Sequence, residues 1–129
     1  MKNCRSGTHS MTIRLAEIDR SDICLVNLNE DVIANEKKGE RPCLIVAKQL
    51  EVKFVVIIPI TTTPNFERFS YTLTIKKDNM NNLENDSIAE IFQIRAISIN
   101  RIVKKIGFLD AHKFGDLQKI LSQYLGLNC

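Results

Sequence analysis

The sequence contains no apolar stretch long enough to cross a membrane. Its longest apolar run, FVVIIPI at residues 54–60, is far shorter than the roughly 20 residues that a membrane-spanning helix needs. The N-terminus also lacks the continuous apolar segment of a secretory signal. We therefore expect a cytoplasmic protein.

Histidine is scarce, and neither the two histidines nor the four cysteines are spaced like metal ligands. No two cysteines form a CxxC pair, and no histidine stands near a cysteine at zinc-ligand spacing. His9 and His112 have no evident partner. We expect no metal site and four unrelated thiols, two of them in buried strands. The cysteines are Cys4, Cys24, Cys43 and Cys129.

Familiar catalytic motifs are missing as well. The chain has no glycine-rich phosphate loop, no internal repeat, no prominent carboxylate pair and no assignable Ser-His-Asp or Cys-His arrangement. No single motif therefore assigns an activity.

The composition that remains is that of a globular domain. The 129 residues suit one domain with its own core, with 44% hydrophobic and 26% charged residues. The net charge of +3 permits an anionic partner without demonstrating one. Basic residues gather in three groups, which are solvated surface unless another signal selects among them. The groups are Lys37, Lys38 and Arg41; Lys76 and Lys77; and Arg101, Lys104 and Lys105.

Most of the chain has the pattern of β-strands. Continuous Val- and Ile-rich runs predict strands buried on both faces, and the alternation in FSYTLTI (69–75) predicts a half-buried strand. Pro59 suggests an edge or a bulge near the end of its strand. The polar segment 76–86 predicts a loop, and ISINRI (97–102) is ambiguous, with room for one helical turn. The predicted strands cover residues 22–28, 42–47, 53–60, 69–75, 87–92 and 103–109.

The C-terminal segment predicts an amphipathic helix. From Ala111 onward apolar residues fall at helical spacing, Asp110 suits the N-cap and Gly126 suits the C-terminal stop. Short strands followed by one helix predict a mainly β (α+β) fold, a small β-barrel or strongly curved sheet with a helix packed on it. We expect a single domain at residues 18–129 after a flexible tail or expression remnant at 1–17, with Met11 as an alternative start.

Four segments carry motifs that occur together in one known family. In order, they are SDICLVNLN (21–29), NEKKGERPCLIVA (35–47), VVIIPITTT (55–63) and NDSIAEIFQIRAISINRIVKKIGFL (85–109). At compatible spacing, they resemble the opening strand, the Glu-x-x-x-x-Arg-Pro loop, the Pro-Ile-Thr strand end and the closing segment of the MazF/PemK toxin endoribonucleases. The resemblance runs from about Ser21 to Leu127.

The resemblance implies an SH3-like barrel, a homodimer and a cognate antitoxin protein as partner. It also implies metal- and cofactor-independent, sequence-selective cleavage of single-stranded RNA, messenger RNA in particular. In that reaction the ribose 2′-OH attacks the adjacent phosphate. Charge gathers on the phosphorane oxygens, and an arginine guanidinium suits them because its planar fork matches two oxygens.

By matching positions, the resemblance assigns the catalytic pair to Arg41 and Thr61. The alternatives are a surface arginine that ends a loop and an ordinary β-branched strand residue. The family's RNA-contacting positions match Glu36, Lys38, Thr62, Asp86, Ser87 and Gln93. For these, the alternatives are a surface charge or a solvent-facing polar residue. Phe66 and Phe69 are candidates for base stacking, with core packing equally open for Phe69.

Some positions depart from the family pattern. Ser21 stands where glycine is usual, and Phe92 stands where an acidic residue often precedes the glutamine. Family members that use that acid in proton transfer are therefore no guide here. Two alternatives to a ribonuclease toxin stay open: a non-catalytic barrel that poisons a protein such as a topoisomerase, and a degenerate toxin that binds nucleic acid without cutting it.

Overall fold

Seven strands and one α-helix make up the part of the chain that the computed structural model describes, residues 15–29 and 39–127. The mainly β architecture with a C-terminal helix agrees with the sequence prediction. The strands are β1 (Asp22–Asn27), β2 (Glu40–Gln49), β3 (Phe54–Thr61), β4 (Thr72–Ile75), β5 (Ser87–Glu90), β6 (Arg95–Ser98) and β7 (Ile102–Phe108). The helix is α1 (Ala111–Leu125), and 3₁₀ turns lie at η1 (Leu15–Glu17), η3 (Leu50–Val52), η4 (Phe66–Arg68), η5 (Ile91–Gln93) and η6 (Ile99–Arg101).

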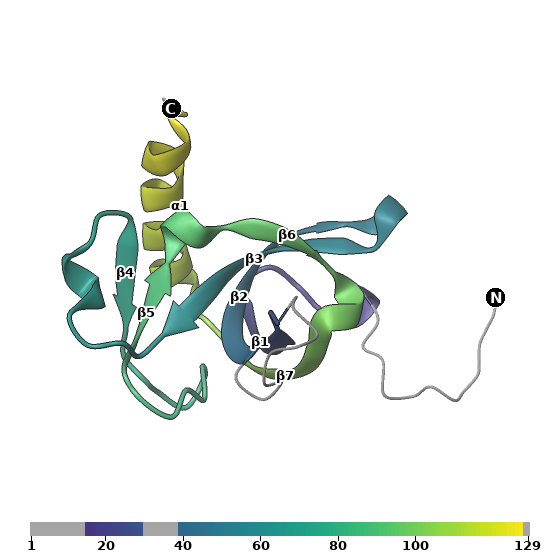
Figure 1. Ribbon diagram of the computed structural model, residues 1–129, viewed down its shortest axis with the longest axis horizontal. Helices are drawn as coiled ribbons and strands as arrows, with labels where there is room; N and C mark the ends of the chain where they lie inside the picture. The colour runs from purple at the N-terminus through teal and green to yellow at the C-terminus, as the bar shows by residue number, and fades with distance from the viewer. Residues whose placement is uncertain (1–14, 30–38, 128–129) are drawn as a thin grey trace.

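All seven strands form one antiparallel sheet (Figure 1). The order is β4-β5-β3-β2-β1-β7, and β6 also pairs with β3. Along one side of β3, residues 54–57 pair with β6, whereas Ile60 and Thr61 pair with β5. Strand β3 therefore links the two halves of the molecule.

Pro59 lies where β3 changes its partner from β6 to β5. Proline has no N–H to donate to a neighbouring strand, so a break between two pairings accommodates it. The sequence suggested an edge or a bulge at this residue. The edge alternative is wrong because β3 is an internal strand, whereas the change of partner at Pro59 is an irregularity of the kind that the bulge alternative expected.

Five strands, β1, β2, β3, β6 and β7, enclose one apolar cluster in a barrel-like wall (Figure 1). β6 pairs with β3, β7 pairs with β1, and η6 joins β6 directly to β7, so the chain itself completes the wall. The cluster comprises Ile18, Cys24, Val26, Cys43, Ile45, Val55, Ile57, Ile97, Ile99 and Ile102.

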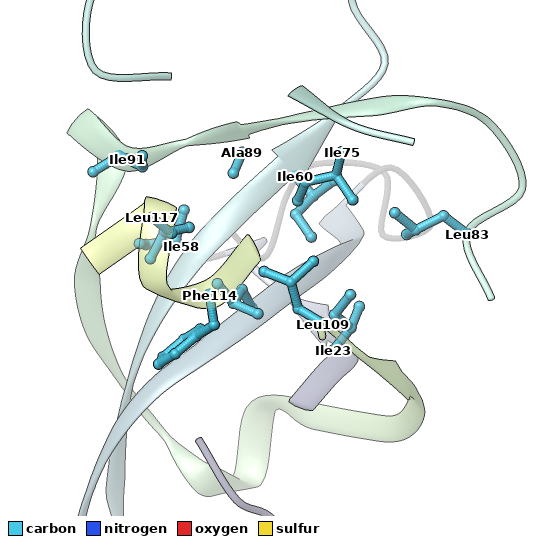
Figure 2. Close-up of a cluster of buried hydrophobic side chains, with 11 residues drawn as sticks. Ile23, Ile58, Ile60, Ile75, Leu83, Ala89, Ile91, Leu109, Phe114 and Leu117 are labelled. Carbon is cyan, nitrogen blue, oxygen red and sulfur yellow. The ribbon is translucent and has the colours of Figure 1, made fainter. Parts of the chain in front are cut away.

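The other face of β2 and β3 packs against α1 (Figure 2). Phe114 and Leu117 of the helix meet Leu44 and Ile58 there. Asp110 caps the helix by accepting a hydrogen bond from the Lys113 N–H at 2.8 Å. The continuous apolar runs are explained, since alternate residues of β2 and β3 face the barrel interior and the helix.

Two sequence predictions need correction. The strand expected at 69–75 is present only as Thr72–Ile75, because Tyr71 has a left-handed backbone (φ 61°) and η4 precedes it. Strand β6 was not predicted, although the helical turn allowed in ISINRI is present as η6. The predicted tail at 1–17 lies mostly outside the described residues and stays a prediction.

Candidate active site

Arg41 lies near the start of β2 and Thr61 at the end of β3, and these two strands pair with each other. Cys43 on β2 lies opposite Pro59 on β3. Continuing this antiparallel register by two residues places Arg41 opposite Thr61, on the same face of the sheet. Directly opposed residues in such a pair have Cβ atoms about 4.5–5.5 Å apart. The two residues singled out from the sequence therefore lie at the same end of the strand pair, each two residues beyond its last paired position.

The Arg41 side chain is held by an acidic residue on β5. Arg41 Nη2 lies 3.0 Å from Glu90 Oε2, a hydrogen-bonded ion pair. The Arg41 side chain is 36% exposed, but that of Glu90 is only 4% exposed. Because β3 lies between β2 and β5, the Arg41 side chain must cross β3 to make this contact. The guanidinium is thereby drawn over the strand that carries Thr61.

Glu90 was not among the residues predicted from the sequence. It is the last residue of β5, whose register with β3 places it beside Pro59. The available signal was an acidic residue inside SIAEIF, a segment otherwise typical of a buried strand. A buried carboxylate is costly unless a cation or hydrogen-bond donor compensates it. That rule predicts a partner for Glu90 but does not identify it.

The Thr61 hydroxyl is ordered by the turn that follows β3. Thr61 is 8% exposed. Its Oγ1 accepts a hydrogen bond from the Thr63 N–H at 3.2 Å and lies 2.9 Å from Thr63 Oγ1. A hydroxyl held in this way keeps one proton that it can donate either to Thr63 or to a bound group.

Cys43 shares this face of the sheet and is buried beneath the charged groups. Burial raises the pKa of its thiol to about 12, while the positive charges of Arg41 and Arg95 oppose that rise. Burial likewise raises the pKa of Cys24 to about 12. Both thiols are free and stay protonated at neutral pH, so they are poor nucleophiles. The expectation of two buried cysteines is confirmed; Cys4 and Cys129 lie outside the described residues.

Thr62 and Ser87 line two hollows beside the strand ends. One, of about 400 Å³, also includes Thr63, Asn65, Glu67, Thr74 and Asp86 among its lining residues. The other, of about 500 Å³, includes Leu25, Pro42, Asn82, Lys104 and Ile106. Asp86 Oδ1 accepts the Lys77 N–H at 2.9 Å, and Ser87 Oγ donates to the Asn85 carbonyl at 2.7 Å. Both residues thus also order the loop before β5.

Gln93 lies apart from those hollows. It is exposed in the turn η5 and lines neither of the two. The neighbouring Phe92 ring stacks on Phe66 at 6.1 Å between centroids, and Phe66 meets Phe69 edge to face at 5.0 Å. Phe69 is 47% exposed. The sequence left core packing open for Phe69, and its exposure shows that it is not packed in the core.

Glu36 and Lys38, two of the predicted RNA contacts, lie outside the described residues. Within residues 15–29 and 39–127, no three His, Cys, Asp or Glu side chains gather as a potential metal site. Among the helices of this part of the chain, none is long and apolar enough to cross a membrane.

Comparison with known proteins agrees with this fold. Residues 19–125 match the PemK-like, MazF-like toxins of type II toxin–antitoxin systems. The chain belongs to this family. It is also 30% identical over 114 residues to an Endoribonuclease MazF of Staphylococcus epidermidis, covering 86% of this chain and 93% of that protein. The resemblance seen in the sequence is confirmed.

Solved structures of MazF proteins share the fold. The Mycobacterium tuberculosis toxin MazF-mt6 matches with a TM-score of 0.66 at 20% identity, over 84% of this chain and 99% of that one. A mycobacterial endoribonuclease in complex with its cognate antitoxin matches with a TM-score of 0.66 at 17% identity, over 85% and 96% of the two chains. The barrel-like fold expected of a MazF/PemK protein is therefore confirmed.

Proposed function

We propose a mechanism for this MazF-like toxin endoribonuclease in which Arg41 and Thr61 bind the scissile phosphate of single-stranded RNA. The observation that supports it is the register of β2 and β3, whose last pair, Cys43 and Pro59, lies two residues from both Arg41 and Thr61 at one end of the sheet. Arg41 is partly exposed, so a phosphate can reach its guanidinium from solvent.

The proposed reaction is an internal displacement at phosphorus. The ribose 2′-oxygen forms a bond to the adjacent phosphorus while the bond from phosphorus to the 5′-oxygen breaks. The 2′-OH loses its proton and the departing 5′-oxygen gains one, which leaves a 2′,3′-cyclic phosphate and a 5′-OH. Arg41 stabilises the charge that develops on the phosphorane oxygens, and the Thr61 hydroxyl donates a hydrogen bond to the same oxygens while keeping its proton.

The flanking hollows suit bases better than phosphates. Glu67 and Asp86 line the smaller one, and their carboxylates would repel a phosphate. Carboxylates do accept hydrogen bonds from the amino groups of bases. We propose that Thr62, Asp86 and Ser87 contact unstacked bases there. Gln93 contacts the RNA separately, at η5.

The remaining proposed contacts come from the family resemblance. Glu36 and Lys38 are proposed to approach the RNA from the loop before β2. The enzyme is proposed to need no metal or cofactor, and to act in the cytoplasm as a homodimer inhibited by a cognate antitoxin.

Cleavage of a long single-stranded RNA in EDTA tests the mechanism. We expect the wild-type protein to cut at discrete sites, and Arg41→Ala and Thr61→Ala each to lose about 10²–10³ in rate, the usual effect of removing one well-placed stabilising donor. Arg20→Ala is the matched control, because Arg20 lies over the Phe114 ring, 5.8 Å from its centroid, on the helix side of the sheet.

Intact RNA with a folded wild-type protein would overturn the nuclease function and favour a binding module. Cleavage that survives in either Arg41→Ala or Thr61→Ala would move the active site elsewhere.

A further inference from the structure

We propose that Glu90 is a positioning residue for Arg41: its buried carboxylate holds one edge of the guanidinium and leaves the other donors facing the substrate phosphate. The inference rests on the proposed function of Arg41. The contact behind it is the 3.0 Å ion pair between Arg41 Nη2 and Glu90 Oε2.

The position of Glu90 makes this contact a stable one. Glu90 ends β5, which is hydrogen-bonded to β3 on one side and to β4 on the other, with Thr72 directly opposite Glu90. Its backbone is therefore fixed within the sheet. With a side chain only 4% exposed, its carboxylate cannot turn to bulk water. A charge buried in this way strongly favours the conformation in which its cationic partner is in place.

The pairing uses only part of the guanidinium. Arginine has five N–H donors in a planar fork, and the contact with Glu90 engages the Nη2 group. A phosphate can be bound by the remaining donors, on the side that solvent reaches. Arg95 also contributes positive charge here, since both Arg41 and Arg95 act on the buried Cys43 thiol. The negative charge of Glu90 therefore does not cancel the attraction for phosphate.

Glu90 acts through Arg41 and not on the RNA. The Arg41 side chain crosses β3 to reach it, and Glu90 is 3% exposed as a whole residue. A group this buried does not touch a substrate on the surface. Its loss should therefore affect the orientation of Arg41 in the transition state more than the binding of RNA.

Steady-state cleavage by Glu90→Gln, with Glu51→Gln as control, tests the positioning role. Glu51 is an exposed residue at η3, on the hairpin between β2 and β3. We expect Glu90→Gln to lower kcat by about 10- to 100-fold, the cost of slightly misplacing a catalytic group, with KM nearly unchanged. Glu51→Gln should match the wild type. Unchanged kcat in a folded Glu90→Gln protein overturns the inference while the nuclease function stands.

A double-mutant cycle in urea tests the pair without any nuclease activity. Arg41→Ala leaves the Glu90 charge buried without its partner, so it should lower the unfolding midpoint. Adding Glu90→Gln removes that charge and should raise the midpoint again. Additive losses would overturn the coupling. Because this measurement needs no RNA, it decides whether Arg41 and Glu90 are coupled even if the wild-type protein proves inactive.

If Glu90→Gln does not fold, nitrogen-15 NMR of the wild-type Arg41 side chain tests whether Glu90 holds the guanidinium. A guanidinium held on one edge rotates slowly and shows separate Nη signals, which Arg41→Lys would assign by their disappearance. Averaged signals typical of a freely rotating arginine would overturn the inference.

Discussion

At the scale of single residues, the site depends on a buried acid that the motifs did not indicate. Phe92 occupies the position where the family often has an acid, and its ring stacks on Phe66. The acid that meets Arg41 is Glu90, two residues earlier and buried in β5. Glu90 does not take over the role of that acid, because it is buried and pairs with Arg41.

The two buried thiols predict how stability changes at alkaline pH. Burial raises the pKa of Cys24 and of Cys43 from an ordinary value of 9.0 to about 12. The unfolded thiols lose their protons first, so their contribution is complete below pH 9 and is lost as the pH rises toward 12. The free energy of unfolding should fall over that window, by at most about 1.4 kcal/mol per pH unit for each thiol.

Urea unfolding of the wild type and of Cys24→Ala/Cys43→Ala between pH 8 and 10.5 checks this. The free energy of unfolding of the double variant should decline less steeply, because it lacks the two thiols whose pKa burial raises. Equal slopes would contradict the effect of burial on the thiols.

At the scale of secondary-structure elements, the loop at residues 76–86 is built onto β7. The Phe108 N–H donates to the Met80 carbonyl at 3.0 Å, and Asn82 Nδ2 donates to the Ile106 carbonyl at 2.9 Å. The fully buried Asn81 donates to the Lys76 carbonyl within the loop. This packing fixes the segment that leads into Asp86 and Ser87.

Gly107 is the residue that permits the close packing of this loop. A Cβ at Gly107 would collide with the Met80 carbonyl and with the Asn81 backbone. Because both obstacles are backbone atoms, Gly107→Ala should destabilise the protein by about 1–3 kcal/mol, as overpacking does. Unfolding of the wild type and the variant in urea measures this loss in the free energy of unfolding.

Gly115→Ala is the matched control for that substitution. Nothing lies within 4 Å of a Cβ added at Gly115, which is in α1. Alanine there should stabilise the helix by about 0.5–1 kcal/mol. Equal effects of the two substitutions would show that the loop does not pack on β7 as described.

At the scale of the whole molecule, the sheet serves two cores. Its barrel half encloses one cluster, and the opposite face of β2 and β3 packs on α1 (Figures 1 and 2). Large apolar side chains remain exposed at Leu50 and Val52 on the β2–β3 hairpin, and at Tyr124 and Leu125 at the end of α1.

The proposed homodimer is a prediction at this scale. Light scattering at micromolar protein concentration should give twice the mass of one chain, and dilution should lower that value only below the dissociation constant. A mass of one chain at micromolar concentration would contradict the dimer. The nuclease assay is independent of this result.

Much of the fold followed from the sequence because its signals are local. Continuous apolar runs predicted the buried strands, and the helical spacing of apolar residues between Asp110 and Gly126 predicted α1. The sequence overestimated the length of β4, because the alternation of apolar and polar residues already begins at residues 69–71, which precede the strand. The positive φ of Tyr71 interrupts the extended backbone there. Alternation records which side chains are apolar, not where the chain bends.

The sequence by itself determined the family, the strand ends that carry Arg41 and Thr61, and the helix that covers the sheet. Only the tertiary structure decided that β3 exchanges β6 for β5 at Pro59, and that Arg41 crosses β3 to meet Glu90. The physical reason is that strand pairing joins residues far apart in the chain, here 49 positions between Arg41 and Glu90. No local pattern encodes such a partner, because the register of three strands together selects it.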